Sequence, residues 1–132
     1  MEAHLATVQL TEKTLDSTVK KGIVLLDFWA AWCGPCRAFA PIFEAAAARH
    51  PDVVFGKVNT EEEPGLAKAF GIRAIPTLAV LRDGVLLAVQ PGMVPAAGLD
   101  ELVKKVRALD MDEVHTSIAA RKPPLSSESE HV

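Results

Sequence analysis

The sequence has no long hydrophobic run and no strong excess of charge of either sign. The apolar run at residues 23–26 stops at Asp27, and nothing approaches the roughly 18 to 20 apolar residues that cross a bilayer. The net charge is −3, residues 1–109 are formally neutral, and the acidic excess lies in residues 110–132. The sequence therefore predicts no membrane span and no basic surface for nucleic acid.

The sequence also has little cysteine and no recognisable export signal. The amino terminus lacks the basic start and apolar stretch of a secretory signal, so we expect a cytoplasmic protein in a reducing environment. Its two cysteines, Cys33 and Cys36, are separated only by Gly34 and Pro35. In a reducing compartment such a close pair is more typical of catalysis or metal binding than of a permanent structural disulfide.

The hydrophobic pattern predicts a single α/β domain over residues 1–109, with a central mixed β-sheet flanked by helices on both faces. Strands are expected at 5–10, 23–29 and 53–59, and as a hairpin around Asp83-Gly84 at 77–90. Helices are expected at about 11–20, 35–49, 60–71 and 95–109. Pro41 should kink the second helix, and Thr60 with Glu63 forms a candidate capping box for the third.

Residues 110–132 are predicted to form a C-terminal extension. Asp110 followed by Glu113 resembles a capping box, so we expect a short helix at about 111–120, stopped by the prolines at 123–124, and then a disordered tail. Met111, Val114 and Ile118 form an apolar stripe on this helix. Four interpretations of the stripe are open: packing on the domain, dimerisation, binding of a dedicated partner, or an adventitious tail with no role. The expected oligomeric state is a monomer or a weak dimer.

The spacing of the cysteines suits disulfide exchange. Cys33 falls at a predicted strand-to-helix junction and Cys36 lies one turn into the helix, so both sulfurs lie on the same side. Backbone N–H groups and the helix dipole favour the thiolate of Cys33, which is the attacking species in exchange. Cys36 would stay protonated until it attacks the resulting mixed disulfide. Gly34 and Pro35 remove bulk beside Cys33, and Trp32 offers a flat apolar wall to another protein.

Other roles for the pair are less well supported. Zinc needs about four ligands. Besides the cysteines, the remaining candidates are four histidines scattered along the sequence, at positions 4, 50, 115 and 131 (His4, His50, His115 and His131). No metal site is therefore predicted. Haem attachment is excluded because Arg37, and not histidine, follows Cys36. A buried inert pair stays open, although a helix start beside Gly-Pro is poorly placed for burial.

Asp27 is an acid within an otherwise apolar strand. An ionised carboxylate is costly there unless it is paired, and burial raises its pKa. Lys57 is the other charge predicted inside a central strand, and neighbouring strands would bring the two together. We expect Asp27 to accept the proton of Cys36 while Lys57 tunes the pKa of Asp27. The other interpretation is a buried structural ion pair or a contact of Asp27 with solvent at the end of the strand.

Taken together, residues 4–109 resemble the thioredoxin family. The matching features are the "WCGPC" motif at 32–36 within "FWAAWCGPCRAFAP", Asp27, Lys57, the "AIPT" motif at 74–77, and Gly92. The resemblance implies a thioredoxin fold and a protein-disulfide reductase in which Cys33 attacks and Cys36 resolves. It implies no bound cofactor, oxidised proteins as substrates, and recycling by an NADPH- or ferredoxin-linked thioredoxin reductase.

The resemblance also implies the layout of the substrate site. The Ile75–Pro76 bond should be cis, with Pro76 against the two sulfurs. An extended peptide would pair with the backbone of the adjoining loop, in a groove formed by Trp32, Gly34, Pro35, Ile75, Thr77 and Gly92. Pro91 and Met93 depart from the residues that the family more often has beside Gly92. A thioredoxin-fold interaction or chaperone-like module without redox turnover is the second function considered.

Overall fold

The computed structural model describes the backbone of residues 5–128 and the side-chain surroundings of residues 5–120. The strands are β1 (Val8–Gln9), β2 (Ile23–Trp29), β3 (Val54–Asn59), β4 (Thr77–Arg82) and β5 (Val85–Pro91). The helices are α1 (Glu12–Val19), α2 (Gly34–Arg49), α3 (Pro64–Ala69), α4 (Ala96–Arg107) and α5 (Met111–Glu128). Apart from β1 and α3, which are shorter than expected, the elements of the domain lie close to the predicted ranges.

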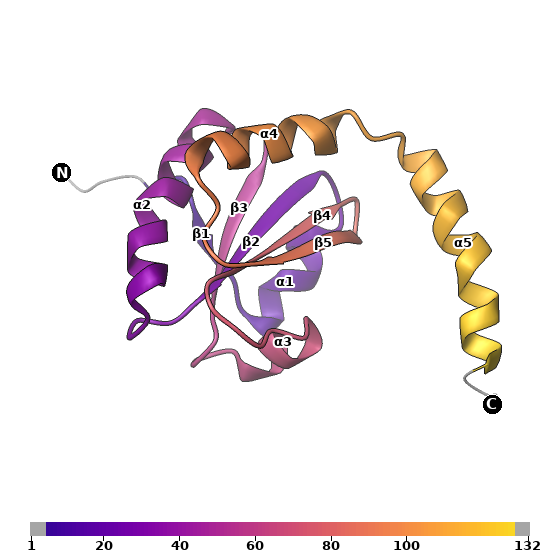
Figure 1. Ribbon diagram of the computed structural model, residues 1–132, viewed down its shortest axis with the longest axis horizontal. Coiled ribbons are helices and arrows are strands. Elements are labelled where there is room, and N and C mark those ends of the chain that lie inside the picture. Colours follow the sequence, from indigo (N-terminus) through magenta and orange to yellow (C-terminus); the bar gives the residue numbers. More distant parts are fainter. Residues whose placement is uncertain (1–4, 129–132) are drawn as a thin grey trace.

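The strands form one mixed sheet in the order β1-β3-β2-β4-β5 (Figure 1). β1, β3 and β2 are parallel, whereas β4 and β5 are antiparallel to their neighbours. β2 is central and buried from Ile23 to Phe28, as its continuous apolar sequence predicts. The thioredoxin fold expected from the sequence is confirmed. Ligand sites in such sheets lie beyond the carboxyl ends of parallel strands, so a functional site is expected at the turn from β2 into α2.

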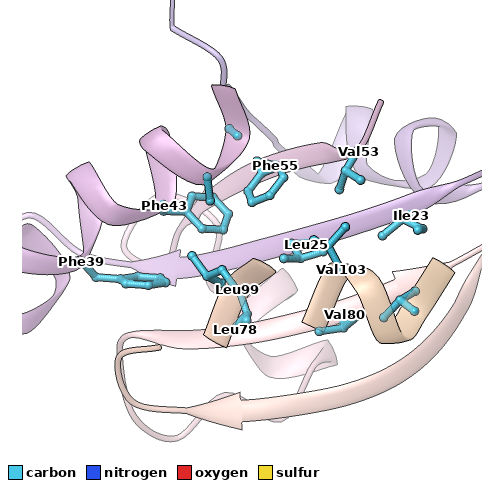
Figure 2. Close-up of a cluster of buried hydrophobic side chains, with 13 residues drawn as sticks. Ile23, Leu25, Phe39, Phe43, Val53, Phe55, Leu78, Val80, Leu99 and Val103 are labelled. Atoms are coloured by element: carbon cyan, nitrogen blue, oxygen red, sulfur yellow. The ribbon is translucent and has the colours of Figure 1, made fainter. Parts of the chain in front are cut away.

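Helices cover both faces of the sheet. On one face, Phe43 of α2 and Val103 of α4 pack with Leu25 of β2 (Figure 2). On the other face, Leu26 belongs to a separate cluster with residues of α1 and α3. Because side chains alternate along a strand, Asp27 lies on the same face as Leu25, beneath α2. The domain core thus places the one acid of β2 on the side of the helix that carries the cysteines.

The predicted capping box at Thr60 is not formed. α3 begins at Pro64, and its N-cap is Glu63 with φ −124° and ψ 61°. A residue before proline avoids the helical region, whereas proline itself fits the first helical position, so the helix starts later than expected. The Thr60 hydroxyl instead donates to the carbonyl of Trp29 at 3.1 Å. The Asn59 side chain accepts the two N–H groups that follow Thr60, at 2.9 and 3.3 Å.

The C-terminal helix begins where predicted and ends later. A carboxylate oxygen of Asp110 accepts the N–H groups of Asp112 and Glu113 at 3.0 and 3.3 Å. α5 then continues past residue 120 and through the two prolines to Glu128. Proline removes its own N–H donor and crowds the carbonyl four residues before it, but it holds φ near the helical value, so a helix can continue through it at a cost in stability. The last part of the expected tail, residues 129–132, lies outside the described residues.

Arg82, at the end of β4, holds the link between α4 and α5. Its Nη1 donates to the carbonyls of Val106 at 2.8 Å, Arg107 at 3.4 Å and Leu109 at 3.1 Å. A cation suits these carbonyls, which a helix C-terminus leaves without intrahelical partners.

We expect Arg82→Met, which keeps the apolar stem and removes the donors, to lower the free energy of unfolding by about 1–2 kcal/mol. Urea denaturation measures the change, and Arg82→Lys, which keeps a donor, should recover part of it. Equal stability of the wild type and Arg82→Met would show that these hydrogen bonds do not hold the link.

Candidate active site

The two cysteines lie where β2 leads into α2. Cys33 is the N-cap of α2, with φ −86° and ψ 113°, and Cys36 lies in the first turn. They form a disulfide with a Cα–Cα distance of 5.2 Å. The backbone N–H of Cys36 donates to the sulfur of Cys33 at 3.2 Å. This N–H and the positive end of the helix dipole favour negative charge on Cys33 once the disulfide is reduced.

Both cysteines are buried, with exposed fractions of 4% for Cys33 and 3% for Cys36. The expectation that this position is poorly placed for burial is wrong, because the loop before β4 covers the pair. The sulfur of Cys33 lies 3.7 Å from the carbonyl oxygen of Ile75. Gly34 and Pro35 are exposed beside the pair. Burial alone therefore does not distinguish a reactive pair from an inert one. The distinction depends on the groups that surround the two sulfurs.

The loop over the cysteines contains a cis Ile75–Pro76 bond, as the resemblance implied. Two hydrogen bonds fix this loop. The Thr77 hydroxyl donates to the carbonyl of Ala74 at 2.6 Å, and the N–H of Gly92 donates to the carbonyl of Pro76 at 2.8 Å. Gly92 has φ +93°, a conformation that favours glycine. The predicted residues of the 75–77 loop and Gly92 are thus held together next to Cys33.

Trp32 forms one wall of a groove beside the disulfide. Its exposed fraction is 67%, and its Nε1 donates to a carboxylate oxygen of Glu61 at 3.2 Å. The groove has a volume of about 210 Å³, and it is lined by Trp32, Thr60, Ala67, Ile72, Arg73, Ala74 and Ile75. Sequence reasoning missed Glu61 and Arg73, because no local motif links either residue to the cysteines.

Asp27 is fully buried, with an exposed fraction of 0%. Among the residues that the structure describes, neither oxygen of its carboxylate has a hydrogen-bond partner. Burial raises its pKa to about 6, and the positive charge of Lys57 opposes the rise. A carboxyl group with this pKa can exchange a proton near neutral pH, which is what a general acid or base requires.

Lys57 lies beside Asp27 in the sheet, as predicted, because β2 and β3 pair these two residues in register. The side chains do not form an ion pair: none joins them within residues 5–120. The Lys57 ammonium instead lies 4.8 Å from the centroid of the Trp29 ring, a cation–π contact. The structural ion pair is therefore not formed. Trp29 was missed, although its place two residues after Asp27 puts both on one face of β2.

Two further features of the described residues bear on function. None of their helices combines the length and the apolar character that crossing a membrane requires. No group of three or more His, Cys, Asp or Glu side chains among them is arranged to hold a metal ion.

Comparisons with known proteins agree with this geometry. The family model described as Thioredoxin matches residues 6–107. A protein named "Putative thioredoxin 2" from Streptomyces coelicolor is 50% identical over 118 residues, covering 89% of this chain and 88% of the relative. The thioredoxin of Bacillus subtilis is 37% identical, covering 76% of this chain and 98% of the relative. Among solved structures, a mutant thioredoxin from Halobacterium salinarum is 30% identical with a TM-score of 0.73, covering 83% of this chain and 99% of that one.

Proposed function

Because this chain belongs to the thioredoxin family and is a thiol–disulfide oxidoreductase that reduces protein disulfides, we propose that Cys33 attacks the substrate and Cys36 resolves the intermediate. The observation that supports these roles is the hydrogen bond from the Cys36 N–H to the Cys33 sulfur at the start of α2. It favours the thiolate at Cys33 and leaves Cys36 deeper in the helix.

The proposed reaction is two successive exchanges. The Cys33 thiolate attacks one sulfur of the substrate disulfide, the substrate S–S bond breaks, and one substrate thiolate leaves. The Cys36 thiolate then attacks the Cys33 sulfur of the mixed disulfide and releases the second substrate thiolate. The substrate gains two electrons, and the chain is left with the Cys33–Cys36 disulfide that the structure contains.

We propose Asp27 as the group that accepts the Cys36 proton before the second exchange. Asp27 lies beneath α2, on the face of the sheet that carries Cys36, and the pKa of its buried carboxyl is raised to about 6. A carboxylate without hydrogen bonds is a stronger base than an exposed one. Lys57 acts on this step through its charge, which keeps the pKa of Asp27 from rising further.

The substrate segment is proposed to bind extended across the groove. Its backbone would pair with the edge formed by Ile75 and Thr77, and its disulfide would then reach Cys33 beside the Ile75 carbonyl. Around it lie Trp32, Gly34, Pro35 and Gly92.

Membership of the thioredoxin family implies substrate proteins and a reductase partner in general. We propose more narrowly that the partner is an NADPH- or ferredoxin-linked thioredoxin reductase, and that the protein acts in the cytoplasm. The division into a domain at residues 1–109 and an extension at 110–132 also stays a proposal.

Trapping of mixed disulfides tests the two cysteine roles. With a disulfide-bonded protein as substrate, Cys36→Ser should accumulate a covalent adduct through Cys33, because the second exchange is blocked. The matched variant Cys33→Ser should accumulate none. Mass spectrometry before and after dithiothreitol measures both. Adducts through Cys36 would reverse the assignment, and the absence of adducts in both variants would favour a binding module without redox turnover.

A further inference from the structure

The C-terminal helix and the edge strand of the sheet border an apolar groove. β5 is the last strand of the sheet, and Leu86 on it has an exposed fraction of 47%. The groove between β5 and α5 has a volume of about 350 Å³, and its apolar lining consists of Val85, Leu86, Leu87, Leu109, Val114 and Ile118. Asp110, Glu113 and Ser117 complete the lining. Apolar side chains thus lie on both walls of the groove, and the α5 side also carries two acids.

This groove lies at the end of the sheet away from the cysteines. Arg82, just before the β4–β5 turn, pairs with Ile23 at the start of β2, whereas Cys33 follows the end of β2. α5 is fixed at its base by the Arg82 contacts and extends to one side of the domain (Figure 1). Ile118 and Leu109 remain exposed in this arrangement. An occupant of the groove would leave the active site free.

We propose that the occupant is α5 of a second copy of this chain, packed antiparallel in a symmetric dimer. The first turn of α5 carries Asp112 and Glu113, and the sequence has Arg121 and Lys122 further along the helix. In an antiparallel pair with its two-fold axis near Ser117, positions 113 and 121 lie at the same level, as do 112 and 122. Acidic and basic positions of the two sequences thus coincide along an antiparallel pair, whereas a parallel pair would place acidic positions at the same level.

The size of the surface sets the expected strength. α5 has 18 residues, which corresponds to a helix of about 27 Å. A contact made by two helices of this length is small, and specific interfaces begin at about 1,200 Å² of buried surface. We therefore expect a reversible dimer with a dissociation constant of about micromolar order. Because the same surface patch serves both copies, the contact closes on itself and does not grow into a filament.

Analytical ultracentrifugation of the full chain from micromolar to millimolar concentration tests the dimer. The wild type should dimerise, while Ile118→Glu and Leu86→Glu should each raise the dissociation constant by at least about tenfold. Thr116→Glu adds the same charge on the exposed opposite side of α5 and should dimerise like the wild type. Unchanged disulfide reduction by all of them would show that the domain is folded.

A charge exchange tests the antiparallel arrangement. Glu113→Arg and Arg121→Glu should each weaken the dimer, and the double variant should recover it, because positions 113 and 121 are too far apart in one helix to compensate within it. A wild type that stays monomeric throughout, or an Ile118→Glu variant that dimerises normally, would overturn the proposal. So would a double variant that fails to recover, which would leave α5 facing its own β5 or another protein.

Discussion

Cys33→Ser is expected to lower the rate of dithiothreitol-driven reduction of a disulfide-bonded protein by at least about a thousandfold. The serine hydroxyl is not ionised near neutral pH, so the hydrogen bond from Cys36 and the helix dipole have no thiolate to stabilise. The substituted side chain is nearly the same size at a buried site, so the fold should survive. Loss of activity would then reflect loss of the attacking thiolate and not loss of the fold.

The controls for this prediction are thermal unfolding and a second cysteine variant. Cys33→Ser and the reduced wild type should unfold at similar temperatures, since neither has the disulfide. Cys36→Ser should still react once with substrate and then stop, because it lacks the resolving thiol. Turnover by Cys33→Ser comparable with that of the wild type would rule out Cys33 as the nucleophile.

Asp27→Asn is expected to raise the free energy of unfolding at pH 8 by about 3 kcal/mol. The pKa of Asp27 is raised from 3.8 to about 6 by burial, so the ionised carboxylate destabilises the folded state. Between pH 4 and 6 the folded state binds more protons than the unfolded state, and wild-type stability therefore falls as the pH rises through this window. Above pH 6 the loss of wild-type stability is close to complete and no longer changes with pH. The asparagine variant has no such loss.

Urea denaturation at pH 4 and pH 8 measures this effect. The gain from Asp27→Asn should be close to its full size at pH 8 and mostly absent at pH 4. Glu101→Gln, which removes an exposed carboxylate from α4, is the matched control and should show little gain at either pH. An equal gain from Asp27→Asn at both pH values would show that charge burial is not its cause.

The variant should also resolve mixed disulfides about 10²-fold more slowly, because it lacks the proton acceptor.

Much of the fold could be predicted from local sequence patterns. The continuous apolar run of β2, the Asp83-Gly84 turn and the proline at the start of α2 each determine their own element. The register of Asp27 with Lys57 followed from their places in two neighbouring strands. The start of α3 was predicted wrongly because the effect of Pro64 on the residue before it outweighs the capping tendency of Thr60.

The finer parts of the site could not be predicted, because they depend on contacts between distant segments. The bond from Trp32 to Glu61 joins two loops, and the burial of the cysteines depends on how the 75–77 loop lies over them. Lys57 had two possible partners on one face of the sheet, and only packing selects Trp29. Sequence spacing specifies which residues are near one another, but not which atoms meet.

The most direct test of the proposed mechanism is the rate of alkylation of each cysteine in the reduced chain. Brief exposure to a small excess of iodoacetamide, followed by peptide mass spectrometry, gives the order of reaction as a function of pH. The proposed roles predict that Cys33 is modified first, and at pH values below the usual pKa of a thiol. Cys36 should not be alkylated until the chain unfolds. Modification of Cys36 before Cys33 would contradict the assignment of the attacking cysteine.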